Sequence, residues 1–505
     1  MSIKKKRFFS FILFFTFIGI LNFSAELPIK DLDQSIEKAL KDWNIAGLAI
    51  AVVKDGQVVH LQGYGYKNVV DKTSVDENTI FGIGSTSKAF GAATIGVLVH
   101  EGKLNWDDKV IDHLPDFQLA DPYVTRELTV RDLLCHRSGV ETNDAIWFGS
   151  VTRDDIVYKA RFLKQAASLR SRFDYHNIMI LTAGQVVASV TGKPWDDIVR
   201  EKIFQPLGMS RTCTSINDFD NYTNVSTPHI PKDEKLVPVA WLNVDSVGPA
   251  GCVNSCAADL ARWVQLHLDK GKYGGKEIWN IRIQNEMHSP QMIMSPQMTA
   301  AAFYKIDKHA HFGLYGLGWM MHDYRGKKIV HHGGATDGMG AFIGLIPEDK
   351  LGVAVVHNTR YTMLLSSLVY RIIDAYLGVP EAEWMDLKPI KIPVRPKKKS
   401  PDLPADTSAS LPLESYTGVY THPLFENIHV KLKDGALVLD FDLYPTAALE
   451  HKYLDTFKTK FEKIISTMWD RTLGHELDVT FFVDAEANVT KMNIFGLGDF
   501  TRIKK

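Results

Sequence analysis

Two strand-like regions that lie far apart in the chain constrain its fold more than any other feature. Residues 48–66 hold two apolar runs that meet at Asp55-Gly56, and an Asp-Gly pair between such runs is typical of a β-hairpin. Residues 317–357 hold further strand-like runs, KKIVHH, AFIGLIP and GVAVVHN. The residues between them, from about 85 to 250, have helical periodicity. This order predicts one sheet assembled from both regions, with a helical domain inserted between them.

The N-terminal segment is typical of an export signal. Residues 4–7 are basic, residues 8–23 form an apolar run, and Ser24-Ala25 offers a cleavage point of small residues. We therefore expect residues 1–25 to be a signal peptide and the protein to be exported, either to the periplasm or out of the cell. The alternative is an uncleaved anchor, because Phe23 is an awkward residue so close to the cleavage point. We expect no other membrane span.

The rest of the chain divides by composition. Residues 387–411 are rich in Pro, Lys, Ser and Asp and are typical of a linker, whereas the alternating runs of residues 412–505 predict a small all-β domain. A formal net charge of −1 gives no basic footprint for nucleic acid. Four cysteines are too few for a disulfide scaffold, and the sequence leaves open whether they are free thiols or include one bridge.

Ser85 and Lys88 are the first candidates for catalysis. Ser-x-x-Lys occurs three times, but Ser2 lies in the targeting segment and Ser35 in an exposed helix. Ser85 opens STSKAFGAATIGVLVHEG, which is apolar nearly all round and predicts a buried helix. Free N–H groups at a helix start stabilise an oxyanion, and Lys88 lies one turn on, on the same face. Burial lowers the pKa of a lysine, so that it can take a proton. The alternative is a capping serine beside a solvated lysine.

Tyr175 and Asn177 form the second candidate pair. Tyr-x-Asn also occurs at Tyr66 and Tyr222, but only Tyr175-His176-Asn177 stands directly before an apolar helix. A phenol beside an ammonium has a lowered pKa and can act as a general base. An asparagine amide can hold a substrate carbonyl and the lysine at once. An ordinary turn at the start of a helix is the alternative interpretation.

The third pattern is His-x-Gly in the stretch KKIVHHGGATDGMGAF. Glycines at the end of a strand allow a substrate backbone to approach the strand edge. A free N–H nearby, that of Ala335, could pair with the N–H of Ser85 as an oxyanion hole. The alternative is a glycine-rich hairpin turn.

The three patterns together, in this order, resemble the serine β-lactamase and penicillin-binding protein superfamily, specifically its class C-like branch. That branch includes D-aminopeptidases, D-Ala-D-Ala carboxypeptidases and family VIII esterases. The S-D-N and K-T-G patterns of class A are absent, and the likeness covers most of residues 40–380. It implies an α/β catalytic domain over residues 26–386, with a mostly antiparallel sheet flanked by helices and an inserted all-α domain at about 90–250. The C-terminal all-β domain resembles the barrel-like appendages of D-aminopeptidase-type members.

The resemblance also assigns roles to the candidate residues. Ser85 becomes the nucleophile, and Lys88 and Tyr175 share the role of base, with no decision between them. The substrate-binding positions that it implies are Asn177, His332, Gly334 and Ala335. His332 rather than His331 takes the third-motif position, because Gly334 and Gly338 then match the glycines of the family. The marker His136-Arg137-Ser138-Gly139 is expected to be structural.

The sequence therefore predicts an exported serine hydrolase that acts through a Ser85 acyl-enzyme on small peptides, including those with D-amino acids, or on esters. Class C β-lactamases carry Lys-Thr-Gly where this chain has His332-Gly333-Gly334, and a histidine is at most partly charged at neutral pH. Efficient β-lactam hydrolysis is for this reason not expected. The alternatives are a penicillin- or peptidoglycan-binding protein without turnover, or a weak class C-like β-lactamase.

The expected chemistry needs no metal and no organic cofactor, only a small-molecule or peptide substrate. A metallohydrolase is the rival enzyme class, since His309, His311, His331 and His332 could be ligands. The sequence has no His-x-His-x-Asp-His or His-Glu-x-x-His cluster, and such chemistry needs three organised ligands. The sequence leaves the oligomeric state and the role of the C-terminal domain open.

Overall fold

The computed structural model describes residues 27–147, 151–232, 234–295, 309–360, 362–389, 407–441, 446–461 and 476–503. The predicted signal peptide lies outside these residues, and so do residues 390–406 of the predicted linker. Within the described ranges, every helix is too short or too polar to cross a bilayer.

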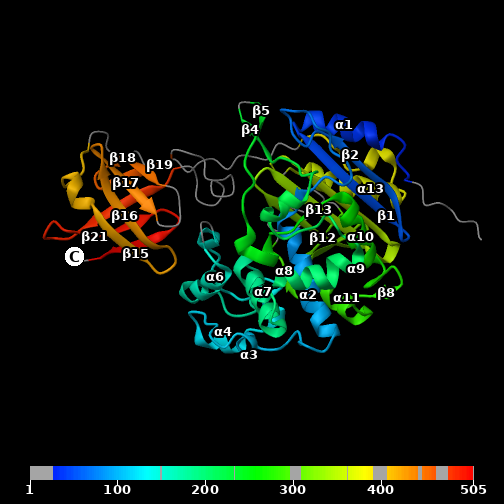
Figure 1. Ribbon diagram of the computed structural model, residues 1–505, viewed down its shortest axis with the longest axis horizontal. Coiled ribbons are helices and arrows are strands. Elements are labelled where there is room, and N and C mark those ends of the chain that lie inside the picture. The colour runs from blue at the N-terminus through cyan, green and yellow to red at the C-terminus, as the bar shows by residue number, and fades with distance from the viewer. Residues whose placement is uncertain are drawn as a thin grey trace, which may run out of the picture.

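The centre of the molecule is an eight-stranded antiparallel sheet with the strand order β2-β1-β14-β13-β12-β11-β10-β9 (Figure 1). The N-terminal hairpin lies beside the late strands, with Ala51 opposite Ala354, which confirms that one sheet is built from both ends of the domain. The strands are β1 (Gly47–Lys54), β2 (Gln57–Gly65), β9 (Met292–Ile293), β10 (Gly313–Tyr315), β11 (Met320–Tyr324), β12 (Lys327–Thr336), β13 (Met339–Ile346) and β14 (Leu351–His357).

Both faces of this sheet are buried, as the side chains of β1 show. Leu48, Ile50 and Val52 face α1 (Leu32–Asp42) and α13 (Leu364–Tyr376). Their neighbours Ala49, Ala51 and Val53 belong to the larger core on the other side, which includes α2 (Ser87–His100) and α10 (Ala257–Leu268). A strand covered on both faces reads as a continuous apolar run, as LAIAVV does.

The inserted region is helical, as expected. Its central helix, α7 (Asn177–Thr191), packs against α2 and ends at Gly192, which has a φ of +70° and so supplies the left-handed residue of a helix C-terminus. The other helices are α3 (Val110–His113), α4 (Pro122–Glu127), α5 (Val130–Leu133), α6 (Arg153–Lys159), α8 (Trp195–Val199), a π-helix (Arg200–Phe204), α9 (Gln205–Leu207) and α11 (Ile281–Met287).

Three two-stranded sheets accompany the main sheet. They are formed by β3 (Phe81–Gly82) with β6 (Asn254–Ser255), β4 (His229–Lys232) with β5 (Lys235–Pro238), and β7 (Lys272–Tyr273) with β8 (Lys276–Glu277).

The C-terminal strands form a closed barrel, which confirms the expected small all-β domain (Figure 1). Apolar residues at every second position of its strands fill the interior, as the alternating burial along β17 shows. Lys159 of α6 forms an ion pair with Glu426 of the barrel, with Nζ and Oε1 2.8 Å apart. The barrel strands are β15 (Gly418–His422), β16 (Glu426–Lys433), β17 (Ala436–Phe441), β18 (Ala447–Tyr453), β19 (Thr456–Phe461), β20 (Asp478–Val483), β21 (Val489–Ile494) and β22 (Gly498–Arg502).

Candidate active site

Ser85 lies in a 3₁₀ turn, Gly84–Thr86, that runs directly into α2. The next two hydroxyls are used by the backbone, since Thr86 donates to the Ile83 carbonyl at 2.8 Å and Ser87 to the Gly84 carbonyl at 2.6 Å. Both of these side chains are buried, whereas Ser85 is partly exposed. Among these three consecutive residues, Ser85 is therefore the one whose hydroxyl a substrate can reach.

Lys88 is fully buried on the same face of the helix as Ser85. Its Nζ lies 3.1 Å from Ser85 Oγ, 2.8 Å from Asn177 Oδ1 and 2.7 Å from the Ala250 carbonyl oxygen. Burial lowers the pKa of Lys88 to about 7, although the nearby charge of Asp144 acts in the opposite direction. A large fraction of the amine is therefore neutral at pH 7 and can accept a proton.

Tyr175 completes the group around the nucleophile. Its ring lies 4.6 Å from Lys88 Nζ, and its hydroxyl is hydrogen-bonded to that of Ser85. Burial raises the pKa of Tyr175, an effect larger than the opposing one of the Ser85 hydrogen bond. The expectation of a lowered tyrosine pKa was therefore wrong, because desolvation is the largest effect on this phenol. The phenol stays protonated and is suited to donate a proton.

A buried ion cluster holds the loop that leads to Tyr175. Asp132 is inaccessible to solvent and accepts hydrogen bonds from Arg137 and Arg170. His136, in the left-handed region with a φ of +61°, accepts the backbone N–H of His176 at its Nδ1. Its ring packs against Tyr175, with the centroids 4.3 Å apart. The marker that contains His136 and Arg137 thus helps to hold Tyr175 and Asn177 in place.

The third motif lies on β12, directly against the turn that carries Ser85. A Cβ on Gly334 would lie 1.9 Å from the Ile83 carbonyl oxygen, and one on Gly84 would lie 2.5 Å from the Ala335 nitrogen. Both glycines are therefore required by close contact between two backbones. The sequence led us to expect that these glycines make room for a substrate, and this was wrong for Gly334, whose space is filled by the chain's own turn.

Ala335 lies in a part of β12 with one open edge. Among the described strands, β11 pairs with β12 only as far as His331, while β13 pairs along its other side to Thr336. The backbone of Ala335 lies against Gly84, and that of Gly334 lies close to the nitrogen of Ser85. Such an arrangement allows backbone N–H groups of Ser85 and Ala335 to point at one oxygen.

The side chain of His332 is only 1 % exposed. Its Nδ1 is 2.7 Å from the Gly333 carbonyl, which can only accept, so this nitrogen carries the proton. Its Nε2 therefore accepts the hydroxyl hydrogen of Tyr315, 3.0 Å away. Burial lowers the pKa of His332 to about 3, so that the ring is neutral. Both nitrogens are used within the protein, and we expect the backbone of this motif rather than the imidazole to meet a substrate.

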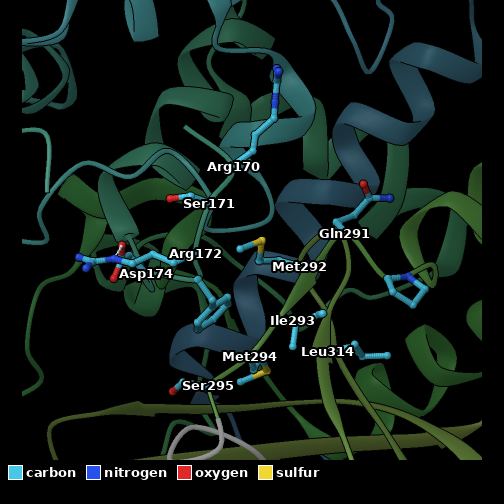
Figure 2. Close-up of a pocket in the computed structure, with 12 residues that line it drawn as sticks. Arg170, Ser171, Arg172, Asp174, Gln291, Met292, Ile293, Met294, Ser295 and Leu314 are labelled. Atoms are coloured by element: carbon cyan, nitrogen blue, oxygen red, sulfur yellow. Dashed lines mark hydrogen bonds and ion pairs between the residues drawn. The ribbon is translucent and has the colours of Figure 1, made fainter. Parts of the chain in front are cut away.

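A cavity of about 980 Å³ is lined by residues 170–174, which directly precede Tyr175 in the chain, and by residues 290–295 and Leu314 (Figure 2). Met292, Met294 and Leu314 line it, and the Arg172–Asp174 ion pair, 2.6 Å long, lies at one side. Phe173 also lines it, and its ring packs against Tyr315 at 5.4 Å and His136 at 5.5 Å. Phe173 thus connects the cavity to His136, whose ring packs against Tyr175.

The structure answers the question that the sequence left open about the cysteines. All four cysteines are free and buried. Within the described residues, no three His, Cys, Asp or Glu side chains come together as a metal site.

Sequence reasoning missed several residues of the site. Tyr315 orients His332, and Asp144 and the Ala250 carbonyl contact Asn177 and Lys88 respectively. Asp144 stands in a polar stretch without a motif, and a backbone carbonyl carries no signal in a sequence. Only the fold brings these groups to the nucleophile.

The fold and the site together define a class, the β-lactamase-like and penicillin-binding serine hydrolases. The chain belongs to the Beta-lactamase family, whose profile matches residues 32–376. Residues 402–503 match a second family, described as a domain of unknown function (DUF3471).

Named relatives agree with this assignment. An unguisins hydrolase of Aspergillus violaceofuscus is 30% identical over 81% of this chain and 77% of its own length. Penicillin-binding protein 4 of Amycolatopsis lactamdurans is 27% identical over 70% of this chain and 92% of its own length. Among solved structures, an octameric penicillin-binding protein homologue from Pyrococcus abyssi superposes with a TM-score of 0.62 at 22% identity, over 94% of this chain and 99% of that one. This last likeness concerns the fold alone.

Proposed function

We propose that this protein is an exported hydrolase that forms an acyl-enzyme on Ser85 with small peptides or esters. The observation that carries the proposal is the set of contacts around Lys88, a buried amine that lies 3.1 Å from the Ser85 hydroxyl. A lysine whose pKa is brought to about 7 by burial is matched to proton transfer near neutral pH. Export is proposed from residues 1–25, which have the pattern of a signal peptide.

In the first step, neutral Lys88 takes the proton of the Ser85 hydroxyl while Oγ attacks the carbonyl carbon of the substrate. The carbonyl oxygen becomes an oxyanion, which the N–H groups of Ser85 and Ala335 stabilise. Collapse of this intermediate breaks the bond to the amine or alcohol, which takes a proton from Tyr175. The Lys88 ammonium then passes a proton to the Tyr175 phenolate, so that both groups regain their starting state.

In the second step, a water molecule attacks the ester carbonyl of the acyl-enzyme. Lys88 takes a proton from this water as the new C–O bond forms, and the bond to Ser85 Oγ then breaks. The Ser85 oxygen recovers its hydrogen from Lys88. The product is the acid, and the enzyme is ready for another cycle.

The substrate class follows from the charges of the site. His332 is neutral and buried, so it offers no cation to a substrate carboxylate of the kind that Lys-Thr-Gly provides. Peptides and esters are therefore favoured over β-lactams. A relative named as a hydrolase of unguisins supports a hydrolase.

A direct test is labelling with a fluorophosphonate, which reacts with activated serines. We expect the native protein to be labelled and Ser85→Ala to lose both labelling and hydrolysis of p-nitrophenyl esters. Turnover that persists undiminished in Ser85→Ala would contradict the proposal. A panel of D-aminoacyl amides, D-Ala-D-Ala peptides, short p-nitrophenyl esters and nitrocefin then identifies the substrate class.

The second candidate is a penicillin- or peptidoglycan-binding protein that is acylated without turnover. A relative named penicillin-binding protein 4 favours it. The time course of product release separates the two. A burst of one equivalent followed by a flat line indicates this second candidate, whereas a continuing linear phase indicates a hydrolase.

A further inference from the structure

Asp144 is a carboxylate beside the nucleophile that neither the motifs nor the mechanism above uses. It begins the 3₁₀ turn Asp144–Trp147 and is partly buried. Its Oδ1 accepts hydrogen bonds from Asn177 Nδ2, 3.0 Å away, and from Trp147 Nε1, 3.1 Å away. In the part of the chain that the structure describes, no cation forms an ion pair with it. Its position is thus fixed by two neutral donors.

This carboxylate determines which way the amide of Asn177 faces. A carboxylate oxygen only accepts hydrogen bonds, so Asn177 must turn its NH₂ group toward Asp144. The other end of the amide, Oδ1, then faces Lys88 Nζ at 2.8 Å. The two ends of an asparagine amide have nearly the same shape, so only hydrogen-bond partners select between them. Asp144 is the partner that selects.

The orientation of Asn177 matters because of how many hydrogens a neutral amine has. Lys88 Nζ contacts two carbonyl oxygens, of Asn177 and Ala250, which can only accept, and one hydroxyl, that of Ser85. The two N–H groups of the neutral amine satisfy the two carbonyls, and its lone pair is left to face the Ser85 hydroxyl. With the amide of Asn177 reversed, its NH₂ group would compete for that lone pair.

We propose that Asp144 is a positioning residue, whose carboxylate fixes the amide of Asn177 and thereby directs the lone pair of Lys88 to the hydroxyl of Ser85. This inference rests on the proposed acyl transfer by Ser85. Removal of the carboxylate should therefore have two separate effects. It should lower the reaction rate of the enzyme form in which Lys88 is neutral, and it should shift the pH at which Lys88 becomes neutral.

The second effect arises from charge. The titratable groups around Lys88 are Asp144, Tyr175, His136 and His332. Burial lowers the pKa of both histidines well below neutral and raises that of Tyr175, so these three stay neutral near pH 7. The nearby charge of Asp144 raises the pKa of Lys88. Without it, the pKa of Lys88 falls further, and the neutral amine persists to lower pH.

The experiment measures the rate of fluorophosphonate labelling as a function of pH on both sides of 7, with the full chain. For Asp144→Asn we expect the limiting rate at high pH to fall about tenfold, the equivalent of one misdirected hydrogen bond. We also expect the midpoint of the acid limb to move to lower pH. Asp434→Asn, the same change at an exposed turn of the barrel, serves as the control and should leave both quantities unchanged.

A double variant, Asp144→Asn with Asn177→Asp, exchanges the carboxylate and the amide. It restores the pattern of donors and acceptors, but the negative charge then lies at position 177. The new carboxylate accepts from Lys88 on one side and from the new amide on the other. We expect its limiting rate to exceed that of Asp144→Asn, and its acid limb to lie above that of the native protein, because the anion then bonds Lys88 directly.

Three results would overturn the inference: a native rate and midpoint in Asp144→Asn, a lowered rate with an unchanged midpoint, or a double variant no faster than the single one. Thermal unfolding checks that each variant is folded. If Asp144→Asn does not fold, Asp144→Glu, which keeps the acceptor and the charge, must retain the native midpoint. Labelling that persists in Ser85→Ala would instead overturn the proposed function, so the two failures are distinguishable.

Discussion

Replacing Gly334 with alanine tests how closely β12 must approach the nucleophile turn. The added Cβ would lie 1.9 Å from the Ile83 carbonyl oxygen and 2.9 Å from the backbone nitrogens of Ser85 and Thr86. These are backbone atoms, which cannot rotate away as a side chain can. A contact below 3.0 Å forces movement, so the strand and the turn must separate by about 1 Å.

The magnitude follows from this displacement. Overpacking of a close contact costs about 1–3 kcal/mol of folding free energy. The effect on catalysis is expected to be stronger than the effect on stability, because a misplacement of about 1 Å lowers the rate about 100-fold. The separation moves Ala335 away from Ser85 and so opens the proposed oxyanion hole. We therefore expect a folded protein with about a hundredth of the native kcat/KM.

The assay is hydrolysis of a p-nitrophenyl ester, together with thermal unfolding to show that the variant is folded. Gly251→Ala is the matched control, because its Cβ would make only an ordinary contact, 3.4 Å from the side chain of Val247. We expect this control to keep activity within a few-fold of native. A Gly334→Ala variant with native kcat/KM would refute the close approach of β12 and the role given to Ala335.

Further predictions concern pH, stability and metals. Because Lys88 acts as the neutral amine and burial lowers its pKa to about 7, kcat/KM should rise with pH and reach half its limit near pH 7, which a pH–rate profile checks. Asp132→Ala should lower the free energy of unfolding by about 3 kcal/mol in urea titrations, because Arg137 loses a buried partner; Asp121→Ala, at the partly exposed N-terminus of α4, should cost only about 1 kcal/mol. Incubation with EDTA should leave ester hydrolysis unchanged, and a loss restored by zinc would contradict the acyl-enzyme mechanism.

Much of the fold could be predicted because its signals are local. The Asp55-Gly56 turn and the apolar runs identified the strands, and their positions at both ends of the domain implied a single sheet. The burial of α2 was also readable, since its sequence is apolar on every side. The choice of Ser85 over Ser2 and Ser35 followed from that environment.

What could not be predicted depends on contacts between distant segments. The pKa of Tyr175 is set by desolvation, which depends on every element packed around it, and not by the neighbour that the motif names. The burial of His332, which lowers its pKa to about 3, and its hydrogen bond with Tyr315 of another strand depend on the fold. The space of Gly334 is filled by the Ile83 carbonyl, far away in the sequence.

Peptide mapping by mass spectrometry after reaction with a fluorophosphonate identifies the nucleophile directly. We expect one adduct per chain, on the peptide that contains Ser85. We also expect Lys88→Met, folded as the native protein, to react far more slowly at pH 7. An adduct on a different serine, or native reactivity without Lys88, would contradict the mechanism described here.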